Sequence, residues 1–417
     1  MDRVLVIGGG ASGMMAAVQA ATVGASVMLL EKMRHLGTKL RITGKGRCNL
    51  TNQGDIDDFM ENYGTGGRFL HNAFARFFND DLISFFHDRG VALVVERGRR
   101  VFPASGDADD VIRCLEDELC RKNVQVERGW PVARICIKDG RVAGVESMDE
   151  IRLDAGAVIV ATGGLSYPGT GSTGDGYQWA RSAGHTVTEL RPALVPLETD
   201  PAEVRELTGL SLKNVRVTAL AGGKAFREIF GEMLFTHTGL SGPIILAISK
   251  EVGDRLKRKE SVMVSINFKP ALSVLQVDRR LQREFSAHGA MQVRTVLRNL
   301  VPAAVADRFV RRAHLSGTVR AADLSRSKRA DLVTLLTDYR IKVEALRPIA
   351  EAIVTAGGVD LREIDPRTME SRLVHGLYFC GEVLDLDGMT GGYNLQAAFT
   401  TGFLAGDSAG RQAGYPT

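Results

Sequence analysis

The stretch VLVIGGGASGMMAAVQAATVGASVMLLE, residues 4–31, decides the fold. Its first residues, Val4–Ile7, form a short apolar run with β-branched side chains, which predicts a buried strand. Small and apolar residues over 14–23 predict a helix, and residues 26–30 predict a second strand that Glu31 follows. The order strand, glycine loop, helix, strand and acid is typical of a βαβ unit that binds a dinucleotide.

The glycines of this loop, Gly8, Gly10 and Gly13, have the G-x-G-x-x-G spacing. Gly8 allows a tight turn, Gly10 lets the backbone approach a pyrophosphate, and Gly13 lets helix and strand pack closely. The N–H groups at the start of the helix, with its positive dipole end, would face the phosphates. The carboxylate of Glu31 would accept hydrogen bonds from ribose hydroxyls and repel a 2′-phosphate.

Composition narrows the range of partners. The 417 residues include 44% hydrophobic and 24% charged residues, which is typical of a soluble protein with two or three domains. Lys and Arg number 53 against 49 Asp and Glu, a formal charge of +4. This excess is too small to indicate binding to nucleic acid or to an anionic membrane. We therefore expect a small-molecule substrate, no nucleic acid and no membrane, while the oligomeric state stays open.

Cysteine usage and the N-terminus indicate the compartment. The five cysteines are an odd number and include no C-x-x-C pair, which favours reduced thiols. The first strand starts at Val4, which leaves no room for a signal peptide, and no apolar run approaches the ~20 residues of a membrane span. We predict a cytoplasmic protein without a metal site.

Two further glycine clusters follow apolar strands. Residues 157–160 lead into Ala161-Thr162-Gly163-Gly164, and residues 377–380 lead into Gly381-Glu382. Glycine brings the backbone close to a ligand, and a carboxylate at a strand end can hold a polyol. Asp385 follows, and Gly391-Gly392 opens a helix whose positive end suits a ring that becomes anionic on reduction. A plain turn at this glycine pair is the alternative.

The glycine-rich pattern of strands and helices ends near His185 and reappears near Val354. Between these points lie strand-like stretches and arginine-rich helical stretches without a dinucleotide fingerprint. We predict one nucleotide-binding domain formed by residues 1–188 and 346–417, interrupted by an inserted substrate or cap domain, residues 189–345. We also expect this insert to cover the reactive face of the cofactor.

Four motifs carry a family resemblance. They are TGKGRCNLTN at 43–52, GGLSYP with TGDG at 163–176, LFTHTGLSGP at 234–243, and GEVLD with TGGYNLQ at 381–396. The chain resembles a bacterial family of NAD(P)/FAD-dependent oxidoreductases that includes aminoacetone-oxidase-like and bile-acid enone-reductase-like members. Lys45 departs from the family, which has glycine there, and it adds a cation beside the expected cofactor.

The resemblance implies an α/β fold: a glutathione-reductase-like Rossmann FAD-binding domain interrupted by a β-barrel plus helical domain. It implies FAD as the cofactor, with NAD(P)H as a candidate transient electron donor, since no second G-x-G-x-x-G follows a strand. The residues that it places at FAD are Gly8, Gly10, Ala11, Ser12, Gly13, Glu31, Lys32, Lys39, Gly44, Gly46, Arg47, Cys48, Asn49, Val132, Ala161, Thr162, Gly163, Gly381, Glu382, Asp385, Gly391, Gly392, Tyr393, Asn394 and Gln396.

The leading interpretation is an FAD-dependent oxidoreductase that moves a hydride between flavin and a small organic substrate. Two versions stay open: NAD(P)H-linked reduction of an activated C=C bond, and amine oxidation with oxygen. His237 is the best acid/base candidate because histidine titrates near neutral pH, although a loop histidine without catalytic role fits equally well. Tyr167 and Tyr393, beside glycine turns, are candidate donors to a carbonyl, and packing against the flavin fits both equally well. Arg47 beside Cys48 could favour a thiolate, but no second cysteine lies at C-x-x-C spacing, so we interpret Cys48 as a contact residue and not as part of a redox disulfide.

Two other classes of function compete with this interpretation. RNA-modifying enzymes share this FAD fold, and the arginines of residues 279–312 could form a basic face. Asp278, Glu284 and Asp307 are interleaved with them, which favours an ordinary solvated helix face instead. The third class is a flavin-binding sensor without turnover, in which neither NAD(P)H nor an amine would reduce the bound FAD.

Overall fold

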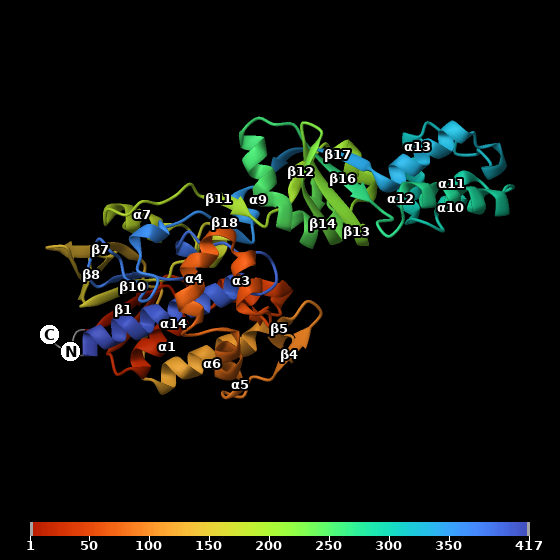
Figure 1. The fold of residues 1–417 in the computed structure, drawn as a ribbon. Coiled ribbons are helices and arrows are strands. Elements are labelled where there is room, and N and C mark those ends of the chain that lie inside the picture. The colour runs from red at the N-terminus through yellow and green to blue at the C-terminus, as the bar shows by residue number, and fades with distance from the viewer. Residues whose placement is uncertain (1–2, 415–417) are drawn as a thin grey trace. The chain divides into compact units, whose positions relative to one another are not determined.

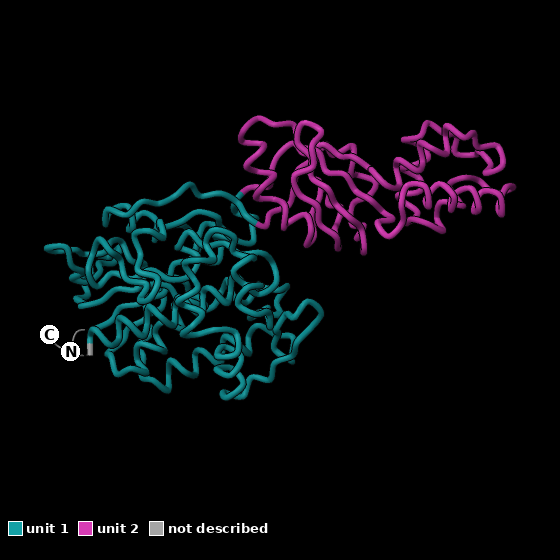
Figure 2. Tube along the Cα trace, in the orientation of Figure 1, with its two compact units in different colours: residues 1–193, 349–417 teal, residues 194–348 magenta. Residues whose placement is uncertain are grey.

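The computed structural model describes residues 3–414 and divides the chain into two compact units (Figure 2). The first unit consists of Met1–Ala193 together with Ile349–Thr417, and the second of Leu194–Pro348. The corresponding limits expected from the sequence were 188/189 and 345/346. The first unit therefore contains both glycine-rich ends of the chain, and the second contains the stretch whose sequence character differs.

A five-stranded parallel sheet forms the centre of the first unit, in the order β19-β10-β1-β2-β6 (Figure 1). Its strands are β1 (Val4–Ile7), β2 (Val27–Glu31), β6 (Gln125–Arg128), β10 (Ala157–Val160) and β19 (Leu377–Phe379). Val4 pairs with Val27 on one side and with Ala157 on the other. Because the chain continues from β1 toward β2 and later returns on the far side of β1, the order of the strands reverses between β1 and β10.

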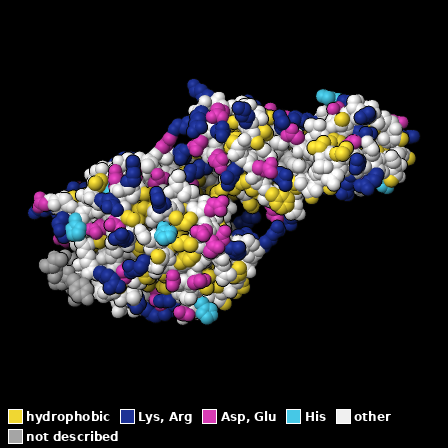
Figure 3. All heavy atoms as spheres, viewed as in Figure 1, with side chains coloured by type: hydrophobic (Ala, Val, Ile, Leu, Met, Phe, Trp, Pro, Cys, Tyr) yellow, Lys and Arg dark blue, Asp and Glu magenta, His cyan; other side chains and the backbone are white. Residues whose placement is uncertain are grey.

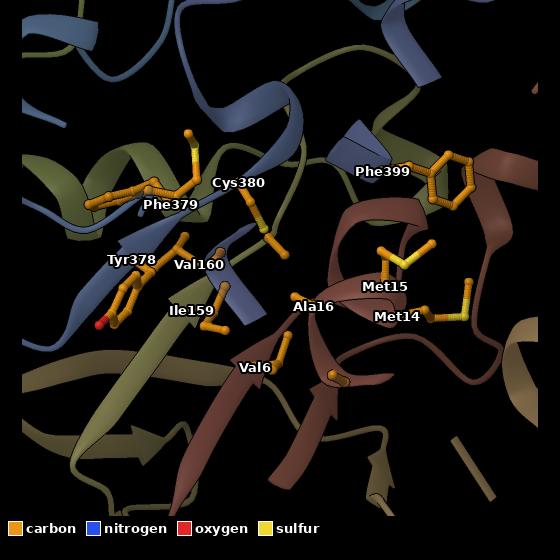
Figure 4. Packing of buried hydrophobic residues seen from close by; sticks show 14 of the residues in the cluster. Val6, Met14, Met15, Ala16, Ile159, Val160, Tyr378, Phe379, Cys380 and Phe399 are labelled. Atoms are coloured by element: carbon orange, nitrogen blue, oxygen red, sulfur yellow. The ribbon is translucent and has the colours of Figure 1, made fainter. Parts of the chain in front are cut away.

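Helix α1 (Ala11–Thr22) packs along the long helix α14 (Tyr393–Gly414), and both lie beside the sheet (Figure 1). A stripe of glycines on α14 permits this contact. A Cβ at Gly402 would lie 2.3 Å from the carbonyl oxygen of Ser12, and one at Gly406 would lie 2.2 Å from that of Ala16. Figure 4 shows the adjoining core, where Met14, Met15 and Phe399 are buried.

The remaining elements of the first unit surround this sheet. A three-stranded sheet contains β3 (Thr51–Asn52), β4 (Leu93–Glu96) and β5 (Arg100–Pro103), and another contains β7 (Val132–Lys138), β8 (Arg141–Ser147) and β9 (Arg152–Asp154). β11 (Arg191–Ala193) pairs with β18 (Val354–Ala356). The helices are α2 (Thr38–Ile42), α3 (Ile56–Asn62), α4 (Gly67–Phe74), α5 (Asn79–His87), α6 (Ala108–Arg121) and α7 (Asp175–Ser182). Short 3-10 turns are η1 (Thr43–Gly46), η2 (Gly64–Gly66), η3 (Pro168–Thr170), η6 (Ile349–Glu351), η7 (Leu361–Glu363) and η8 (Gly381–Val383).

The second unit contains a closed barrel of six strands in the order β12-β15-β14-β13-β16-β17. These are β12 (Leu197–Thr199), β13 (Ser211–Ala221), β14 (Lys224–Phe235), β15 (Gly239–Ser241), β16 (Val262–Asn267) and β17 (Tyr339–Leu346). Helix α9 (Pro243–Lys257) packs on the barrel, and α8 (Pro201–Val204) with η4 (Arg205–Leu207) follows β12. The helical cap comprises α10 (Val274–Ala287), α11 (Val293–Leu297), α12 (Ala303–Arg312), η5 (Ala321–Asp323) and α13 (Arg326–Thr337).

This architecture confirms the predicted fold class, a Rossmann-type domain interrupted by a barrel and helices. Each unit has a hydrophobic core of its own. No helix among residues 3–414 has the length and apolar character needed to cross a membrane. The same described residues contain no group of three or more His, Cys, Asp or Glu side chains that could hold a metal ion.

Candidate cofactor and active site

The carboxyl ends of the parallel strands meet at one edge of the sheet. Gly8 follows β1 and donates its N–H to the carbonyl oxygen of Leu30 at 2.8 Å. Ala161 follows β10 and donates to the carbonyl oxygen of Ile7 at 2.9 Å, while Cys380 follows β19 and donates to that of Val160 at 3.1 Å. Open parallel sheets bind ligands at this edge, where the strand order reverses. The three glycine clusters found in the sequence are thereby brought together.

The glycines after β1 differ in what surrounds them. A Cβ at Gly8 would lie 2.5 Å from the carbonyl oxygen of Ala161, and the φ angle of Gly8 is +107°. At Gly13 a Cβ would lie 1.8 Å from the carbonyl oxygen of Gly8. A Cβ at Gly10, in contrast, would have no atom within 4 Å. Chain packing therefore requires glycine at positions 8 and 13, whereas Gly10 faces open space.

Gly10 is also the N-cap residue of α1, and no side chain caps this helix. The first turn, which includes Ala11 and Ser12, contains no acidic residue. The early N–H groups of a helix lack partners within the helix, and the dipole gives that end a partial positive charge. Open space, free N–H groups and positive potential together form a site for a phosphate group.

The carboxylate of Glu31 lies beside this loop and is 9% exposed. Its two oxygens accept hydrogen bonds from the backbone N–H groups of Gly9 and Met33, both at 2.7 Å. The N–H of Trp130 donates to the carbonyl oxygen of Glu31 at 3.0 Å, which brings the segment leading into Val132 alongside. Glu31 is thus held in place by the main chain, and each carboxylate oxygen can accept a further hydrogen bond.

Lys32 has an acidic partner. Its ammonium lies 2.5 Å from a carboxylate oxygen of Asp175, the first residue of α7, and also contacts the hydroxyl of Thr173. Gly174, and not Asp175, is the N-cap residue of α7. The carboxylate of Asp175 therefore does not cap this helix, and it neutralises Lys32.

A hydrogen-bonded network surrounds Glu382, in the turn that follows β19. The ammonium of Lys39 lies 2.5 Å from Oε2, while the hydroxyl of Ser166 and the N–H of Thr355 donate to Oε1 at 2.9 and 2.8 Å. Lys39 also donates to Ser166 at 2.6 Å. Lys39 and Glu382 were expected from the sequence, whereas Ser166 and Thr355 were not, although Ser166 lies within the GGLSYP motif.

Asp385 lies nearby on the chain and accepts a hydrogen bond from the hydroxyl of Thr188 at 2.9 Å. Thr162, in the loop after β10, has a buried hydroxyl oxygen without a hydrogen-bond partner among residues 3–414. Gly163 beside it has a φ angle of +71°. A buried hydroxyl without a partner is costly, so Thr162 offers a hydrogen bond to a group that enters the crevice.

The loop that contains TGKGRCN has an unusual backbone. Gly44, Lys45, Gly46 and Cys48 have φ angles of +58°, +61°, +86° and +56°. The guanidinium of Arg47 stacks on the ring of Phe102, 4.3 Å from its centroid, and pairs with Glu96. Lys45 therefore adopts a conformation that glycine adopts more readily. This conformation explains why the family that the sequence resembles has glycine at this position.

Cys48 in this loop is fully buried. Burial raises the pKa of its thiol to about 12, against a smaller opposing effect of a hydrogen bond with Thr43. Arg47 does not favour a thiolate at neutral pH, because its guanidinium contacts Phe102 and Glu96 and does not lower the pKa of Cys48.

The start of α14 packs against β3. A Cβ at Gly392 would lie 2.3 Å from the carbonyl oxygen of Thr51, and the amide oxygen of Asn49, in its satisfied orientation, accepts from the N–H of Gly392 at 3.0 Å. The hydroxyl of Thr51 donates to the amide oxygen of Gln396 at 2.6 Å, and Gln396 is fully buried. Gly391 has a φ angle of +135°.

Tyr393 and Asn394 also have partners within the chain. The ring of Tyr393 packs against Phe59 with centroids 4.8 Å apart. The amide of Asn394 both accepts from the N–H of Gly388 and donates to its carbonyl oxygen, each at 2.8 Å. The side chains of Tyr393, Asn394 and Gln396 thus hold the loop and helix in place, and their predicted contacts with the cofactor stay a prediction.

The two catalytic candidates lie in different units. Tyr167 is 38% exposed in the first unit and has a φ angle of +52°. Its N–H donates to the carbonyl oxygen of Ala350 at 3.1 Å, and its own carbonyl oxygen accepts from the N–H of Thr170 at 2.8 Å. His237 is exposed in the turn between β14 and β15 of the second unit. Both residues therefore stay candidates for the acid/base role.

Comparisons with known proteins identify the family. The model of the HI0933-like protein Rossmann domain matches residues 2–408. The chain belongs to this family. A Clostridium scindens protein, 3-dehydro-bile acid delta(4,6)-reductase, is 34% identical over 411 residues, which cover 98% of this chain and 99% of that protein. The Haemophilus influenzae protein named ribosomal RNA dihydrouridine synthase is 31% identical over 414 residues, 98% of each chain.

Among solved structures, the Mycobacterium smegmatis Sdh1 complex in the apo form shares the fold with a TM-score of 0.54 and 17% identity. The match covers 100% of this chain and 70% of that one, and at this identity it shows the fold alone. The family and the fold place the chain among the flavin-dependent oxidoreductases. The family, fold class and enzyme class predicted from the sequence are therefore confirmed.

Proposed function

We propose that the crevice at the carboxyl edge of the sheet binds FAD. The observation that carries this proposal is the open space at Gly10, next to an uncapped helix N-terminus and the Glu31 carboxylate. The N–H groups of α1 would hold the pyrophosphate, and Glu31 would accept from the adenosine ribose. Glu382 and Asp385 have free lone pairs for ribityl hydroxyls, and Thr162 has a hydroxyl without a partner.

We further propose that the reaction saturates a C=C bond conjugated with a carbonyl group. FAD, when bound and reduced by NAD(P)H, would supply a hydride from its ring N5. A delta(4,6)-reductase acting on a 3-dehydro bile acid and a synthase forming dihydrouridine both reduce such a bond, although one substrate is a steroid and the other a nucleobase. The hydride adds to the β-carbon and a proton adds to the α-carbon, so that one C=C becomes a single bond.

The chain must supply the proton and hold the carbonyl oxygen. Tyr167 suits either task because its phenol is exposed while its backbone is fixed at both ends. His237 is the second candidate for the proton. No second dinucleotide fingerprint follows a strand, so NAD(P)H would act as a transient donor. These points favour the reductase version over amine oxidation, which neither of these relatives suggests.

A second candidate substrate is a uracil base within RNA, in place of a small molecule. The observations that favour it are the dihydrouridine synthase relative and the arginine-rich helix α10.

A cytoplasmic location suits either substrate. The five cysteines, none of which forms a disulfide, support this location.

Anaerobic stopped-flow spectroscopy tests this function. We expect a yellow protein that releases FAD, and not FMN, on denaturation, because FMN would leave the adenosine half of the crevice empty. NADH or NADPH should bleach the flavin, and a 4,6-dien-3-one steroid or a uridine-containing RNA should restore its colour. Tyr167→Phe should leave bleaching intact and slow recolouring by about 10²–10⁴-fold. Bleaching by amines alone, or a colourless protein that ignores added FAD, would overturn the proposal.

A further inference from the structure

Positive charge is concentrated in one part of the chain. Residues 269–338, which contain the helical cap, include thirteen Lys and Arg against six Asp and Glu, a formal charge of +7. The whole chain carries +4, so all other residues together sum to −3. Figure 3 shows Lys and Arg side chains gathered along the edge of the cap where Figure 1 places α10. The small net charge of the chain therefore conceals a strongly basic region.

Many arginines of this region have structural partners. Arg308 and Arg312 pair with Glu203 at 2.8 and 2.9 Å, and Arg329 pairs with Asp278 at 2.8 Å. These pairs join helices of the cap to one another or to α8. Such arginines are neutralised within the fold and contribute little to the external field.

The arginines on the outer face of α10 have fewer acidic partners. Among residues 3–414, Arg279 and Arg283 form no ion pair and no side-chain hydrogen bond, and Arg280 comes no closer than 3.9 Å to Glu284. Burial, together with the charge of Arg280, lowers the pKa of Lys269. Arg279 and Arg283 thus lie close to Arg280 without acids of their own, and Glu284 is the one acid paired with this group among the described residues, an arrangement that an anionic partner would stabilise.

A shallow hollow lies on the same face. Its lining is Leu272, Gln276, Arg279, Arg280, Gln282 and Arg283. Residues 276, 279, 280 and 283 have i, i+3, i+4, i+7 spacing and so share one side of the helix. The opposite side packs into the core through Val277, Leu281 and Phe285. The arginine side is therefore not needed for packing.

We propose that this α10 face, defined as Gln276, Arg279, Arg280 and Arg283, binds the phosphate backbone of a folded RNA. Guanidinium groups match phosphate oxygens in bidentate geometry, and a glutamine amide can bind phosphates or 2′-hydroxyls. The lining contains no aromatic ring on which a base could stack. The face therefore binds the phosphate backbone of an RNA duplex and not unpaired bases. The inference rests on the second substrate candidate above and assigns it a docking surface.

An anionic membrane is the competing partner. Val274 and Leu275 at the start of α10 are 60% and 58% exposed, and basic helices with exposed apolar residues bind lipid surfaces. The arginines outnumber these apolar side chains and lie on the side with the hollow, so RNA is favoured. Vesicles therefore enter the experiment as a separate arm.

The experiment measures fluorescence anisotropy of a labelled RNA hairpin with a stem of about 16 base pairs, titrated with full-length protein over a range of salt concentrations. The variant R279Q/R280Q/R283Q should weaken binding at low salt by at least about tenfold. It should also reduce the slope of log K against log salt by about 3, one unit for each lost phosphate contact. The control R113Q/R152Q/R367Q removes the same charge from exposed positions of the first unit and should retain wild-type binding.

Equal effects of the two triple variants would overturn the proposal, because net charge alone would then explain binding. Binding of the wild type to phosphatidylserine vesicles but not to the hairpin would overturn it in favour of a membrane. Recolouring of the bleached flavin by a steroid dienone is measured in parallel on both variants and should not change. Its failure in the wild type would contradict the proposed reaction while leaving the RNA result intact.

Discussion

The ammonium of Lys39 and the carboxylate of Glu382 lie 2.5 Å apart, although 343 positions separate them in the sequence. Their side chains are 21% and 17% exposed, so both charges are largely removed from water. Lys39 comes from α2 and Glu382 from the turn after β19, and the contact closes one side of the proposed ribityl site. This single ion pair therefore joins the two glycine-rich ends of the chain.

Lys39→Met should destabilise the protein because it leaves Glu382 charged and without its cation. We expect a loss of about 1–3 kcal/mol in the free energy of unfolding, below the value for a fully buried pair because water reaches both groups. FAD occupancy should fall in parallel. Urea denaturation and the flavin absorbance of purified protein measure the two effects. Lys39→Met with Glu382→Gln is the control and should recover stability; no recovery would contradict the charge argument.

Gly10→Val and Gly13→Ala should separate a ligand contact from a packing requirement. The valine enters the open space at Gly10, so the apoprotein should lose no more than about 1 kcal/mol of stability while FAD affinity falls at least about tenfold. The alanine at position 13 would overlap the carbonyl of Gly8 and should cost about 2–4 kcal/mol. Thermal unfolding of apoprotein and FAD titration give both numbers. If Gly10→Val binds FAD with wild-type affinity, the pyrophosphate does not bind at this loop.

Much of this fold could be predicted because its signals are local. The βαβ fingerprint from Val4 to Glu31 combines a continuous apolar run, fixed glycine spacing and a helical stretch, all within one segment. The same glycine-rich pattern reappears after Val354, which indicated that a domain is inserted between the two segments. Local pattern reports which face of an element is buried, and this is sufficient to place the glycine clusters at strand ends.

Contacts between distant segments could not be predicted in the same way. Ser166, from a loop, and Thr355, from β18, complete the Glu382 network, and only the three-dimensional path of the chain joins them. Gln396 follows a glycine pair as a cofactor contact would, yet its amide is used by Thr51 and Thr400. Burial of a polar side chain depends on what packs over it, which no spacing rule reports.

Cys48 should react slowly with thiol reagents in the native state. Its thiol is fully buried and its pKa is raised to about 12, so the thiolate is scarce at pH 8. Cys120 is exposed and should react first. Timed alkylation with iodoacetamide, followed by peptide mass spectrometry, ranks the two sites, with urea-unfolded protein as the control. Labelling of Cys48 as fast as Cys120 in native protein would refute its burial.

Lys45→Gly should stabilise the protein. Lys45 has a φ angle of +61°, a conformation that costs L-residues about 1–2 kcal/mol, and glycine adopts it freely while losing more chain entropy on folding. The net gain should be about 0.5–1 kcal/mol in the free energy of unfolding. Lys45→Asn, which tolerates the conformation and also removes the charge, is the control for FAD affinity. A loss of stability in Lys45→Gly would mean that the ammonium makes a compensating contact.

His185 should make stability depend on pH below about 6.5. Its ring is buried, with one nitrogen 3.0 Å from the carboxylate of Glu363 and the other 2.7 Å from the hydroxyl of Ser371. Burial lowers the pKa of His185, and the hydrogen bond and charge of Glu363 oppose this shift only in part.

The unfolded chain therefore binds a proton near pH 6.5 while the folded chain does not, so stability is complete above that pH and is lost as the pH falls toward the lowered pKa. Urea unfolding at intervals from pH 7.5 to about 5, above the range in which carboxylates titrate, measures this slope. His185→Gln retains hydrogen-bonding groups but cannot take up the proton, so its slope should be smaller. Equal slopes in the wild type and His185→Gln would assign the pH dependence to other groups.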